Sequence, residues 1–423
     1  MSRARAWLVA LTAMLAMSVS YADRQIVSAV ATSVRGALGI DATAFGWLAG
    51  AFSLSYLVFA PLAGALVDRV GARRGLLVGV VAWSCVSAAH ALAPSFAALF
   101  ALRVLLGLTE APSFPSAAQS VRRALPPKDR SAGLGLIFTG SSIGAAVAAP
   151  LAVWLDVRFG WRTAFLVASA LGLSWLPLWL LVTRRRDVRD ALATPEAGGP
   201  GSAPAPASAP APRTPPPSRL TLLSEPAVLR CVVMTLASAP VLMFVFLWLP
   251  QYLELGRGLP KPTLGAYLWL PPVMADVGML GFGVLASALD RRHPHGPRSH
   301  VELMAAAALL ASTIALVPRV ADAWPAVLLV GVACVGGGGL YTLLTADVLA
   351  RIDPAFVSTA SGLLAASQSL VYVAVNPLVG RWVDRTHSFD GVMVAFGALT
   401  LPGAVAWALW PMPRPSPALT PAR

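Results

Sequence analysis

Residues 101–123 read ALRVLLGLTEAPSFPSAAQSVRR, and this stretch decides how the chain folds. Arg103 and Glu110 lie inside an apolar run that carries no other charged side chain between Arg74 and Arg122. A run of about 20 apolar residues spans the hydrocarbon core of a bilayer as a helix. A charge in such a helix is unfavourable by roughly three to more than ten kcal/mol unless it is paired or faces water. The stretch therefore predicts a membrane helix with two functional charges.

The composition of the whole chain agrees with a membrane location. Of its 423 residues, 57% are hydrophobic and only 12% are charged, whereas soluble proteins carry about 25% charged residues. We therefore expect an all-α integral membrane protein in a lipid bilayer. The net charge of +13 does not indicate a nucleic-acid partner, because the arginines cluster in short loops between apolar runs.

Other composition signals exclude several classes of site. Cys85, Cys231 and Cys334 are scattered within apolar runs, so we expect packing residues and neither a disulfide framework nor a metal or cofactor site. The N-terminus, MSRARAWLVALTAMLAMSVSYADR, imitates a signal peptide. Because nearly everything after it is apolar, we expect an uncleaved first membrane helix.

The hydropathy pattern predicts about twelve spans in two sets of six. They lie near residues 6–32, 44–68, 73–93, 95–120, 131–156, 161–183, 228–253, 264–289, 301–318, 324–349, 357–383 and 389–411. We expect two six-helix bundles, residues 1–183 and 228–411, and a tail at 412–423. The linker between them, residues 184–227, is rich in Pro, Ala, Gly and Ser and is predicted to be extended or disordered.

Arg and Lys counts predict the orientation of the chain in the membrane. With the N-terminus inside, the inner loops hold clusters such as Arg69, Arg73 and Arg74 or the run at 184–186, whereas the outer loops hold isolated charges such as Arg35. Positive charges accumulate on the cytoplasmic side. We therefore expect both termini and the linker in the cytoplasm.

The two halves also repeat each other. GALVDRVGARR (64–74) corresponds to LASALDRRHP (285–294), and APLAVWLDVRFG (149–160) corresponds to NPLVGRWVDRTH (376–387). Internal repeats of this kind are typical of transporters with a site between two similar bundles.

These motifs resemble a known family. Residues 64–74 resemble the signature of the major facilitator superfamily between spans two and three. A sharper resemblance is to its anion:cation symporter branch, which carries hexonates, hexuronates and related organic anions with protons. It rests on Tyr21-Ala-Asp23-Arg24, Arg103 to Glu110-Ala-Pro-Ser-Phe-Pro115, Gly160-Trp161-Arg162-Thr-Ala-Phe165 and Leu247-Trp248-Leu249-Pro250-Gln-Tyr252-Leu253. It covers nearly all of the membrane part and is weaker in spans ten to twelve.

The resemblance implies a fold and a function. The fold is the major facilitator fold, and the protein is a transporter and not an enzyme. It implies proton-coupled uptake of a small organic anion, a sugar acid or another carboxylate, by alternating access in the bacterial inner membrane. We expect a monomer, and a proton-driven efflux antiporter of the same superfamily is the alternative.

Four charged residues and one tyrosine are the main candidates for the site. Arg103 and Glu110 share a helix face about 10.5 Å apart along the axis, too far for a direct pair. Counting residues from the span ends places Asp23 at a depth similar to that of Arg103. Asp23 and Glu110 are candidate proton carriers, Arg24 should bind the substrate carboxylate, Arg103 should balance a carboxylate, and Tyr56 should bind substrate hydroxyls. The resemblance gives the matching positions the roles of proton-coupling carboxylates, substrate arginine and binding tyrosine; the structural alternative is that they lock helices together.

Further candidates are less specific. Asp276 is the only acid well inside a span of the second half, where it binds a cation or substrate hydroxyl or caps a kinked helix after Pro271 and Pro272. Substrate-lining candidates are Ser141, Trp248 and Gln368, together with Tyr341 and Ser367; for each of the last four, core packing is the simpler interpretation. The candidate gate at the cytoplasmic end comprises Asp68, Arg69, Arg73 and Arg74, which otherwise only set the topology.

Some positions depart from the family pattern or imitate another motif. Ser141 follows Gly140 where the family often has glutamine, and Ala366 stands where it has asparagine. Both changes favour a substrate that is smaller or less hydroxylated than a hexonate. The segment Gly140-Ser-Ser-Ile-Gly144 matches a nucleophile elbow, but it lies in an apolar helix where small residues allow close packing.

Overall fold

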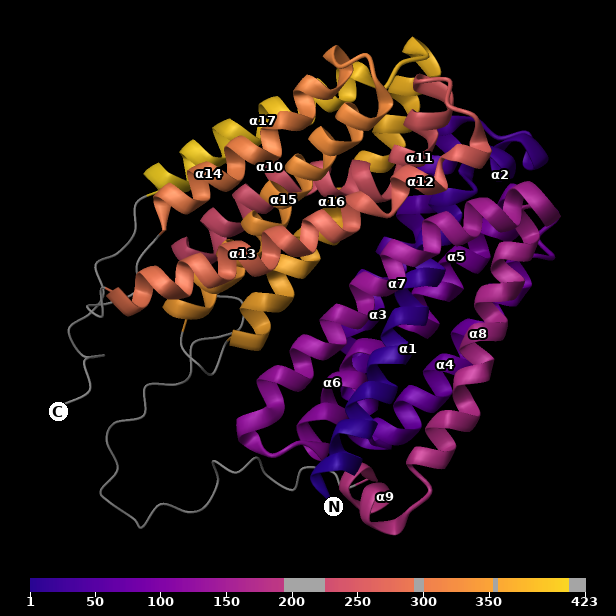
Figure 1. The fold of residues 1–423 in the computed structure, drawn as a ribbon, viewed down its shortest axis with the longest axis vertical. Helices are drawn as coiled ribbons and strands as arrows, with labels where there is room; N and C mark the ends of the chain where they lie inside the picture. Colours follow the sequence, from indigo (N-terminus) through magenta and orange to yellow (C-terminus); the bar gives the residue numbers. More distant parts are fainter. Residues whose placement is uncertain (194–224, 293–299, 353–356, 411–423) are drawn as a thin grey trace.

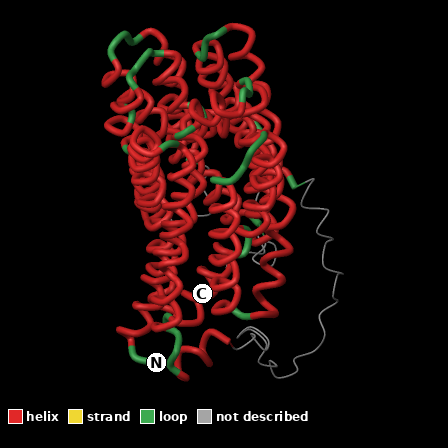
Figure 2. The backbone as a smooth tube through the Cα atoms, turned by 90° about the vertical axis from the view of Figure 1, so that its right-hand side faces the viewer, coloured by secondary structure: helices red, strands yellow, loops and turns green. Residues whose placement is uncertain are grey.

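The computed structural model describes residues 1–193, 225–292, 300–352 and 357–410. Over these ranges the regular structure is helical and contains no β-strand, as Figure 2 shows. Twelve helical stretches within them are long and apolar enough to cross a membrane. The prediction of an all-α membrane protein with twelve spans is therefore confirmed. The predicted tail at 412–423 lies outside the described residues.

Two bundles make up the molecule, one from each half of the chain (Figure 1). The helices of the first half are α1 (Arg3–Ala29), α2 (Ala31–Leu38), α3 (Ala42–Val70), α4 (Ala72–His90), α5 (Phe96–Glu110), α6 (Ser113–Ala124), η1 (Pro127–Asp129), α7 (Arg130–Phe159), α8 (Trp161–Val182) and α9 (Arg186–Ala193). Those of the second half are α10 (Pro226–Leu247), α11 (Leu249–Gln251), η3 (Tyr252–Gly256), η4 (Lys261–Thr263), α12 (Gly265–Leu268), α13 (Leu270–Arg292), α14 (Val301–Ser312), η5 (Thr313–Arg319), α15 (Ala323–Arg351), α16 (Val357–Thr386) and α17 (Asp390–Leu409).

Glycines in the quoted motifs make two of the sharp turns between spans. Gly71 joins α3 to α4 with φ 84°, and Gly160 joins α7 to α8 with φ 85°. A side chain is strained at such angles, so glycine is the residue that fits. The glycines of GALVDRVGARR and GWR thus reverse the chain at the membrane boundary.

The Gly140–Gly144 segment packs α7 against α1. A Cβ on Gly144 would lie 2.0 Å from the backbone oxygen of Ser18, and one on Gly140 would lie 2.5 Å from the Met14 Cγ. Ser142 between them is in the middle of α7 and not at a strand-to-helix turn. The close-packing interpretation of this segment is therefore confirmed.

The two halves join at one end of the molecule, which we call the closed end; it carries α2, α11 and α12 (Figure 1). Several polar contacts cross between the halves there. They are Ser28 to the Leu247 carbonyl (3.0 Å), Thr32 to Glu254 (2.6 Å), Arg35 to Gln251 (2.8 Å), and Lys261 to Asp156 (2.7 Å), Thr32 and Ser33.

Helices α3 and α16 bring the halves together most closely. Asp384 of α16 accepts hydrogen bonds from the first backbone amides of α3, Ala42 and Thr43, both at 2.8 Å. A Cβ on Gly380 would lie 2.2 Å from the Ala42 oxygen, and one on Gly46 would lie 2.4 Å from the Asn376 oxygen. The carboxylate caps a helix N-terminus in the other half, and two glycines permit the backbone contact.

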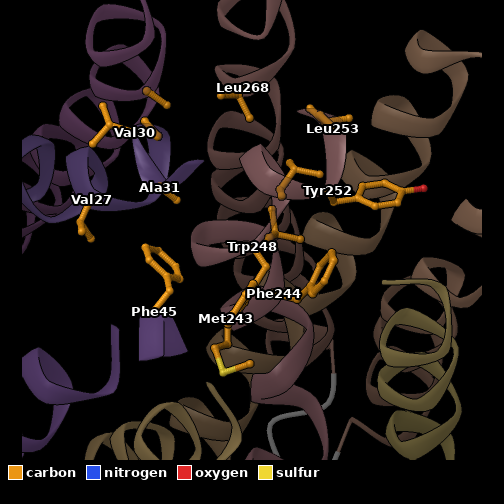
Figure 3. Close-up of a cluster of buried hydrophobic side chains, with 14 of the residues drawn as sticks. Val27, Val30, Ala31, Phe45, Met243, Phe244, Trp248, Tyr252, Leu253 and Leu268 are labelled. Atoms are coloured by element: carbon orange, nitrogen blue, oxygen red, sulfur yellow. The ribbon is translucent and has the colours of Figure 1, made fainter. Parts of the chain in front are cut away.

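Apolar side chains from both halves fill the closed end. In Figure 3, Val27, Val30 and Phe45 of the first half lie with Met243 and Phe244 of the second. All five side chains are 0% exposed, so they leave no open surface between the halves at this level. The closed end is therefore sealed by an apolar plug and by polar contacts around it.

The opposite end, which we call the linker end, is where the bundles separate and where α6 and α9 lie (Figure 1). Two ion pairs at this end, Arg3 to Asp129 (3.2 Å) and Arg5 to Asp187 (3.0 Å), each join residues of the first half only. Helix α9 docks on that half through the buried Val188. The prediction of an extended or disordered linker is wrong for residues 186–193, which form α9 because their apolar side chains fall on one helix face. Residues 194–224 of the predicted linker lie outside the described residues.

Candidate functional site

The stretch that opens the sequence analysis is a broken helix in the structure. Helix α5 ends at Glu110 and α6 begins at Ser113. Pro112 has no amide hydrogen to continue the hydrogen-bond ladder, so the helix is interrupted just after Glu110. The fourth span thus bends at the residue that carries its carboxylate.

Glu110 is fully buried and is held by two residues of α1. Arg24 donates from Nε to Oε2 of Glu110 at 2.9 Å, and Ser20 donates its hydroxyl hydrogen to Oε1. Ser20 and Arg24 are four residues apart, so they lie on one face of α1. Each oxygen of the carboxylate therefore has a donor, and the charge is paired within the membrane interior.

Arg24 lies among aromatic rings and is the partly exposed member of this pair. Its guanidinium carbon lies 4.6 Å from the ring centre of Tyr21, 5.1 Å from that of Phe52 and 4.8 Å from that of Tyr56. The side chain is 18% exposed, whereas that of Glu110 is 0% exposed. Aromatic faces stabilise a cation without neutralising it, so Arg24 remains able to bind an anion.

Asp23, the neighbour of Arg24, points into the bundle. It is fully buried, and its Oδ1 accepts the hydroxyl hydrogen of Ser87 from α4. Among the described residues, Oδ2 has no hydrogen-bond partner. A buried carboxyl oxygen without a donor is unfavourable when it is charged, so this position suits a group that takes up a proton.

Arg103 completes a group of four charges, Asp23, Arg24, Arg103 and Glu110, which we call the first-half cluster. The Arg103 side chain is buried, lies over the Phe52 ring at 5.1 Å, and interacts electrostatically with both Asp23 and Glu110. Two carboxylates and two guanidinium groups sum to zero net charge when all four are ionised. Such neutrality lowers the penalty for placing charges in the bilayer interior.

Three other predicted residues, Asp276, Gln368 and Ser141, make their observed contacts outside this cluster. Asp276 of α13 is half-buried and interacts with Ser142 of α7, across the two halves. Gln368 interacts with Tyr372, its neighbour one turn along α16. Ser141 turns its hydroxyl back to the Ile137 carbonyl of its own helix at 3.3 Å. The roles of these residues in substrate binding stay predictions.

Tyrosines from both halves face a common space. Tyr341 of α15 is 45% exposed and interacts electrostatically with Tyr21 and Tyr56 of the first half. Tyr372 of α16 interacts with Tyr21 as well. Tyr21 of α1 and Tyr56 of α3 are the tyrosine rings that lie over Arg24, and their phenol hydroxyls supply donors and acceptors beside it.

Trp248 lies in the plug of the closed end in this state. It is fully buried, donates its indole hydrogen to Asn376 at 2.8 Å, and packs edge-on against Phe45 at 5.5 Å. Figure 3 shows it between α10 and the apolar side chains of the plug. Its indole donor is used within the second half, and only its ring contact with Phe45 reaches the first half. Its role as a substrate contact stays a prediction.

The candidate gate residues lie at the linker end. Asp68 accepts a hydrogen bond from Gln119 (2.9 Å), and Arg73 donates to Thr183 (2.9 Å), both within the first half. Arg69 and Arg74 are exposed. These four residues therefore lie where the two bundles are apart, and their role as a gate stays a prediction.

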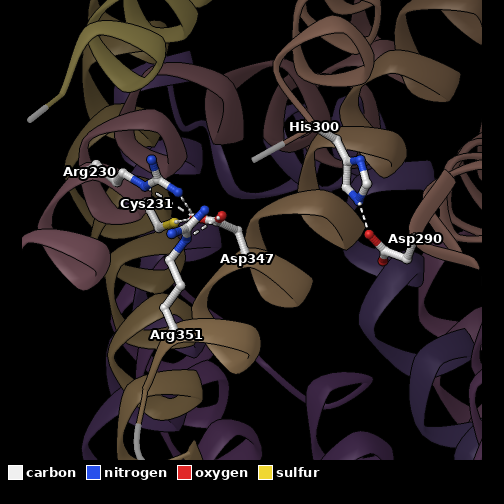
Figure 4. Close-up of polar contacts among 6 residues, drawn as sticks. All are labelled: Arg230, Cys231, Asp290, His300, Asp347 and Arg351. Atoms are coloured by element: carbon white, nitrogen blue, oxygen red, sulfur yellow. Dashed lines mark hydrogen bonds and ion pairs between the residues drawn. The ribbon is translucent and has the colours of Figure 1, made fainter. Parts of the chain in front are cut away.

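The sequence analysis missed a buried ion cluster in the second half, shown in Figure 4. Asp347 of α15 is buried, accepts from Arg230 of α10, and accepts from Arg351 at 2.9 Å. This carboxylate lies at the end of its span, which runs to Val348, and so differs from Asp276, which was expected well inside a span. Asp347 is two residues before the end of its predicted span, and Arg351 is two residues after that end, so Arg351 was assigned to a loop. The signal that could have identified the pair is their four-residue spacing on one helix.

No group of side chains suited to a metal ion occurs among the described residues. The three cysteines are free; Cys231 and Cys334 are buried as predicted, but Cys85 is exposed on the outer face of α4.

Comparison with known proteins identifies the family. The sequence profile of the Major Facilitator Superfamily matches residues 13–375. The chain belongs to this superfamily. The family is one of transporters and not of enzymes, so the expectation of a transporter is confirmed.

Several relatives are similar over nearly their whole length. The chain is 26% identical to a hexuronate transporter of Bacillus subtilis (93% of this chain, 91% of the relative). It is 25% identical to a hexuronate transporter of Escherichia coli K12 (98% and 95%) and 23% identical to a D-galactonate transporter of E. coli O6:H1 (96% and 95%). The resemblance to hexuronate-type transporters is thereby confirmed.

A solved structure shares the fold. It is a bacterial homologue of the human lysosomal transporter Spinster, in an inward-facing and occupied conformation. The TM-score is 0.77 at 17% identity, over 97% of each chain. The two chains therefore share a fold. Together with the twelve apolar helices, the family match shows that this chain is a multi-pass membrane protein.

Proposed function

We propose that this protein is a proton-coupled transporter that takes up a small organic anion, a sugar acid or a related carboxylate, by alternating access. The relatives named above are transporters of hexuronate and D-galactonate, and they support a carboxylate as substrate. The first-half cluster supplies a guanidinium for that carboxylate and two buried acids for protons.

The observation that carries this proposal is the Arg24–Glu110 pair. Its arginine is partly exposed among tyrosine rings, and its carboxylate is fully buried. A substrate carboxylate therefore competes with Glu110 for Arg24. Protonation of Glu110 removes that competitor, and a carboxylate on Arg24 in turn favours the protonated form. The two ligands then bind cooperatively, as symport requires.

Asp23 would act as a second proton site in this scheme. It is buried with one oxygen unpartnered, and its neighbour on α5 is the cation Arg103. Protonation of Asp23 would remove one of the two negative charges near Arg103. Glu110 would then be the main electrostatic partner of Arg103. Proton binding at Asp23 can therefore alter the balance of the whole cluster.

Alternating access follows from the unequal ends. By the excess of arginine at the linker end, we propose that this end is cytoplasmic and that the structure is inward-facing. To open outward, the protein must break the contacts of Lys261 with Asp156 and of Asp384 with α3. The bacterial inner membrane is the location that fits this orientation.

The test is anion binding by purified protein with and without Arg24. We expect Arg24→Ala to weaken binding of galacturonate and galactonate at least about 30-fold, because a buried charged hydrogen bond is lost. Arg24→Lys should recover part of the affinity, and Arg158→Ala, at an exposed arginine, should change nothing. Unchanged affinity in Arg24→Ala would remove this residue from the site.

Uptake into proteoliposomes then decides the direction of coupling. An inward proton gradient should drive accumulation of the anion. Accumulation driven only by a proton gradient of the opposite sense would support the efflux antiporter instead.

A further inference from the structure

Helices α1, α4, α5 and α8 enclose four buried polar residues, and the proposed function does not explain why some of their polar atoms lack partners. They are Asp23, Ser87, His90 and Arg103, each at most 2% exposed. Among the described residues, no hydrogen-bond partner exists for Oδ2 of Asp23, Nε2 of His90, or Nε and Nη1 of Arg103. Nearly all buried polar atoms in folded proteins are hydrogen-bonded, so these atoms call for an explanation.

The imidazole of His90 is fixed in position and in tautomer. Its Nδ1 lies 2.8 Å from the Val86 carbonyl oxygen, which can only accept, so Nδ1 carries the hydrogen. The ring stacks on Phe165 of α8 with centres 5.0 Å apart and planes 20° apart. In this neutral ring, Nε2 is an acceptor held at one place in the interior of the bundle.

Arg103 supplies donors that match this acceptor. A guanidinium only donates, and two of its nitrogens are without partners here. Its charge acts on both His90 and Asp23. Helix α5, which carries Arg103, packs against α4, which carries His90. Two unpartnered donors of Arg103 and two unpartnered acceptors, one on Asp23 and one on His90, therefore lie in the buried interior of one bundle.

We propose that His90 is a positioning residue for Arg103: its Nε2 accepts a hydrogen bond from the guanidinium, directly or through one buried water, and so competes with Asp23 for this cation. The other charged groups around Arg103 are Glu110 of α5 and Arg24 of α1. Helices α3 and α8 present Phe52 and Phe165 to the group, not charges.

The proposal has a consequence for proton binding at Asp23. A guanidinium shared with His90 stabilises the Asp23 carboxylate less than one that belongs to Asp23 alone. His90 therefore favours protonation of Asp23 without itself gaining or losing a proton. This inference concerns the proton coupling proposed above, and its relevance to transport rests on that proposed function.

The test uses two variants of purified protein and needs no substrate. His90→Phe keeps a flat ring against Phe165 but removes the acceptor, whereas His90→Gln keeps an acceptor oxygen. Infrared spectroscopy follows the carboxylic-acid carbonyl band during a pH titration, and Asp23→Asn identifies the contribution of Asp23. Ser84→Ala, on the same buried face of α4, is the control for loss of a polar group.

We expect the Asp23 band of His90→Phe to develop about one pH unit lower than in the wild type, since a hydrogen bond to a charged group is worth roughly that much. His90→Gln and Ser84→Ala should stay close to the wild type. No shift in His90→Phe, or equal shifts in His90→Phe and His90→Gln, would overturn the proposal. Because the readout is independent of substrate, a failure of anion transport leaves this result interpretable.

A second measurement avoids the risk that His90→Phe does not fold. Nitrogen-15 NMR of histidine-labelled wild-type protein reports whether an unprotonated Nε2 accepts a hydrogen bond, and His90→Gln assigns the signal. A resonance displaced toward the hydrogen-bonded position supports the proposal. A resonance at the position of a free Nε2 contradicts it.

Discussion

Each half of the molecule buries arginines with carboxylates, but the two groups differ in how completely they are paired. In the second half, Arg230, Asp347 and Arg351 form a cluster in which both oxygens of Asp347 accept from guanidinium groups (Figure 4). Arg230 also lies over the Trp407 ring at 4.4 Å. In the first-half cluster, Asp23 and Arg103 keep buried atoms without partners among the described residues.

The difference teaches how buried charge is used in a membrane protein. A fully paired cluster has one favoured arrangement, so it fixes helices α10 and α15 against each other. An incompletely paired cluster has several arrangements of similar energy, so a proton or an anion can select among them. We therefore expect substitutions in the second-half cluster to affect stability and those in the first-half cluster to affect coupling.

The largest effect should come from Asp347→Ala. Removing one partner of a buried ion pair destabilises a protein by about 3–5 kcal/mol, because the other charge stays buried. Thermal unfolding in detergent should show a large drop in melting temperature. Adding Arg230→Met should restore part of the loss, since an apolar replacement of the whole pair is tolerated better.

Asp290→Asn is the matched control for that experiment. Asp290 also pairs with a basic residue, His300 at 3.1 Å, but its side chain is 58% exposed. We expect almost no change in its melting temperature. An Asp347→Ala protein as stable as Asp290→Asn would break the distinction between the clusters.

An intermediate effect is expected at the closed end, where an ion pair joins the halves. Lys261→Met should leave the fold stable but favour opening, because the partly buried bond to Asp156 is lost. A cysteine at Gln25, which lines a pocket between the halves, should react with an impermeant maleimide about fivefold faster, from roughly 1 kcal/mol. Lys128→Met at the linker end is the control, and equal rates in both variants would contradict a gate at Lys261.

The smallest effect is expected for Arg5→Ala. The Arg5–Asp187 pair at the linker end is exposed, with side chains 44% and 36% accessible. Surface pairs of this kind are worth about 0–1 kcal/mol and are screened by salt. Melting temperature and uptake should both stay near the wild type. A loss comparable to that of Asp347→Ala would show that pairing, and not burial, sets the energy.

Much of this fold was predictable because a helix that crosses a bilayer needs a long apolar segment, and such segments are visible in the hydropathy pattern. Apolar length predicted the twelve spans, and the rarity of intramembrane charge singled out Asp23, Arg24, Arg103 and Glu110. The structure brings these four residues from α1 and α5 together. Their proximity could be anticipated from depth along each helix, which residue counting gives.

The partners of these charges could not be predicted. Ser20 and Ser87 hold the two carboxylates, yet serine is common in membrane helices and its spacing carries no distinctive signal. Asp347 was overlooked because hydropathy defines span ends only to within a few residues. Helix α9 was missed because the proline-rich sequence after it led to the assignment of the whole segment as a linker. Side-chain neighbours across helices depend on helix rotation, which periodicity leaves open in a mostly apolar segment.

The account depends most on Glu110 as the group that couples proton and anion binding through Arg24. The most direct measurement is the dependence of anion uptake on the pH gradient in proteoliposomes containing Glu110→Gln. Glutamine still accepts from Ser20 but holds no exchangeable charge, so gradient-driven accumulation should disappear while anion exchange and binding persist. Uptake in this variant with the same dependence on the pH gradient as the wild type would contradict the account.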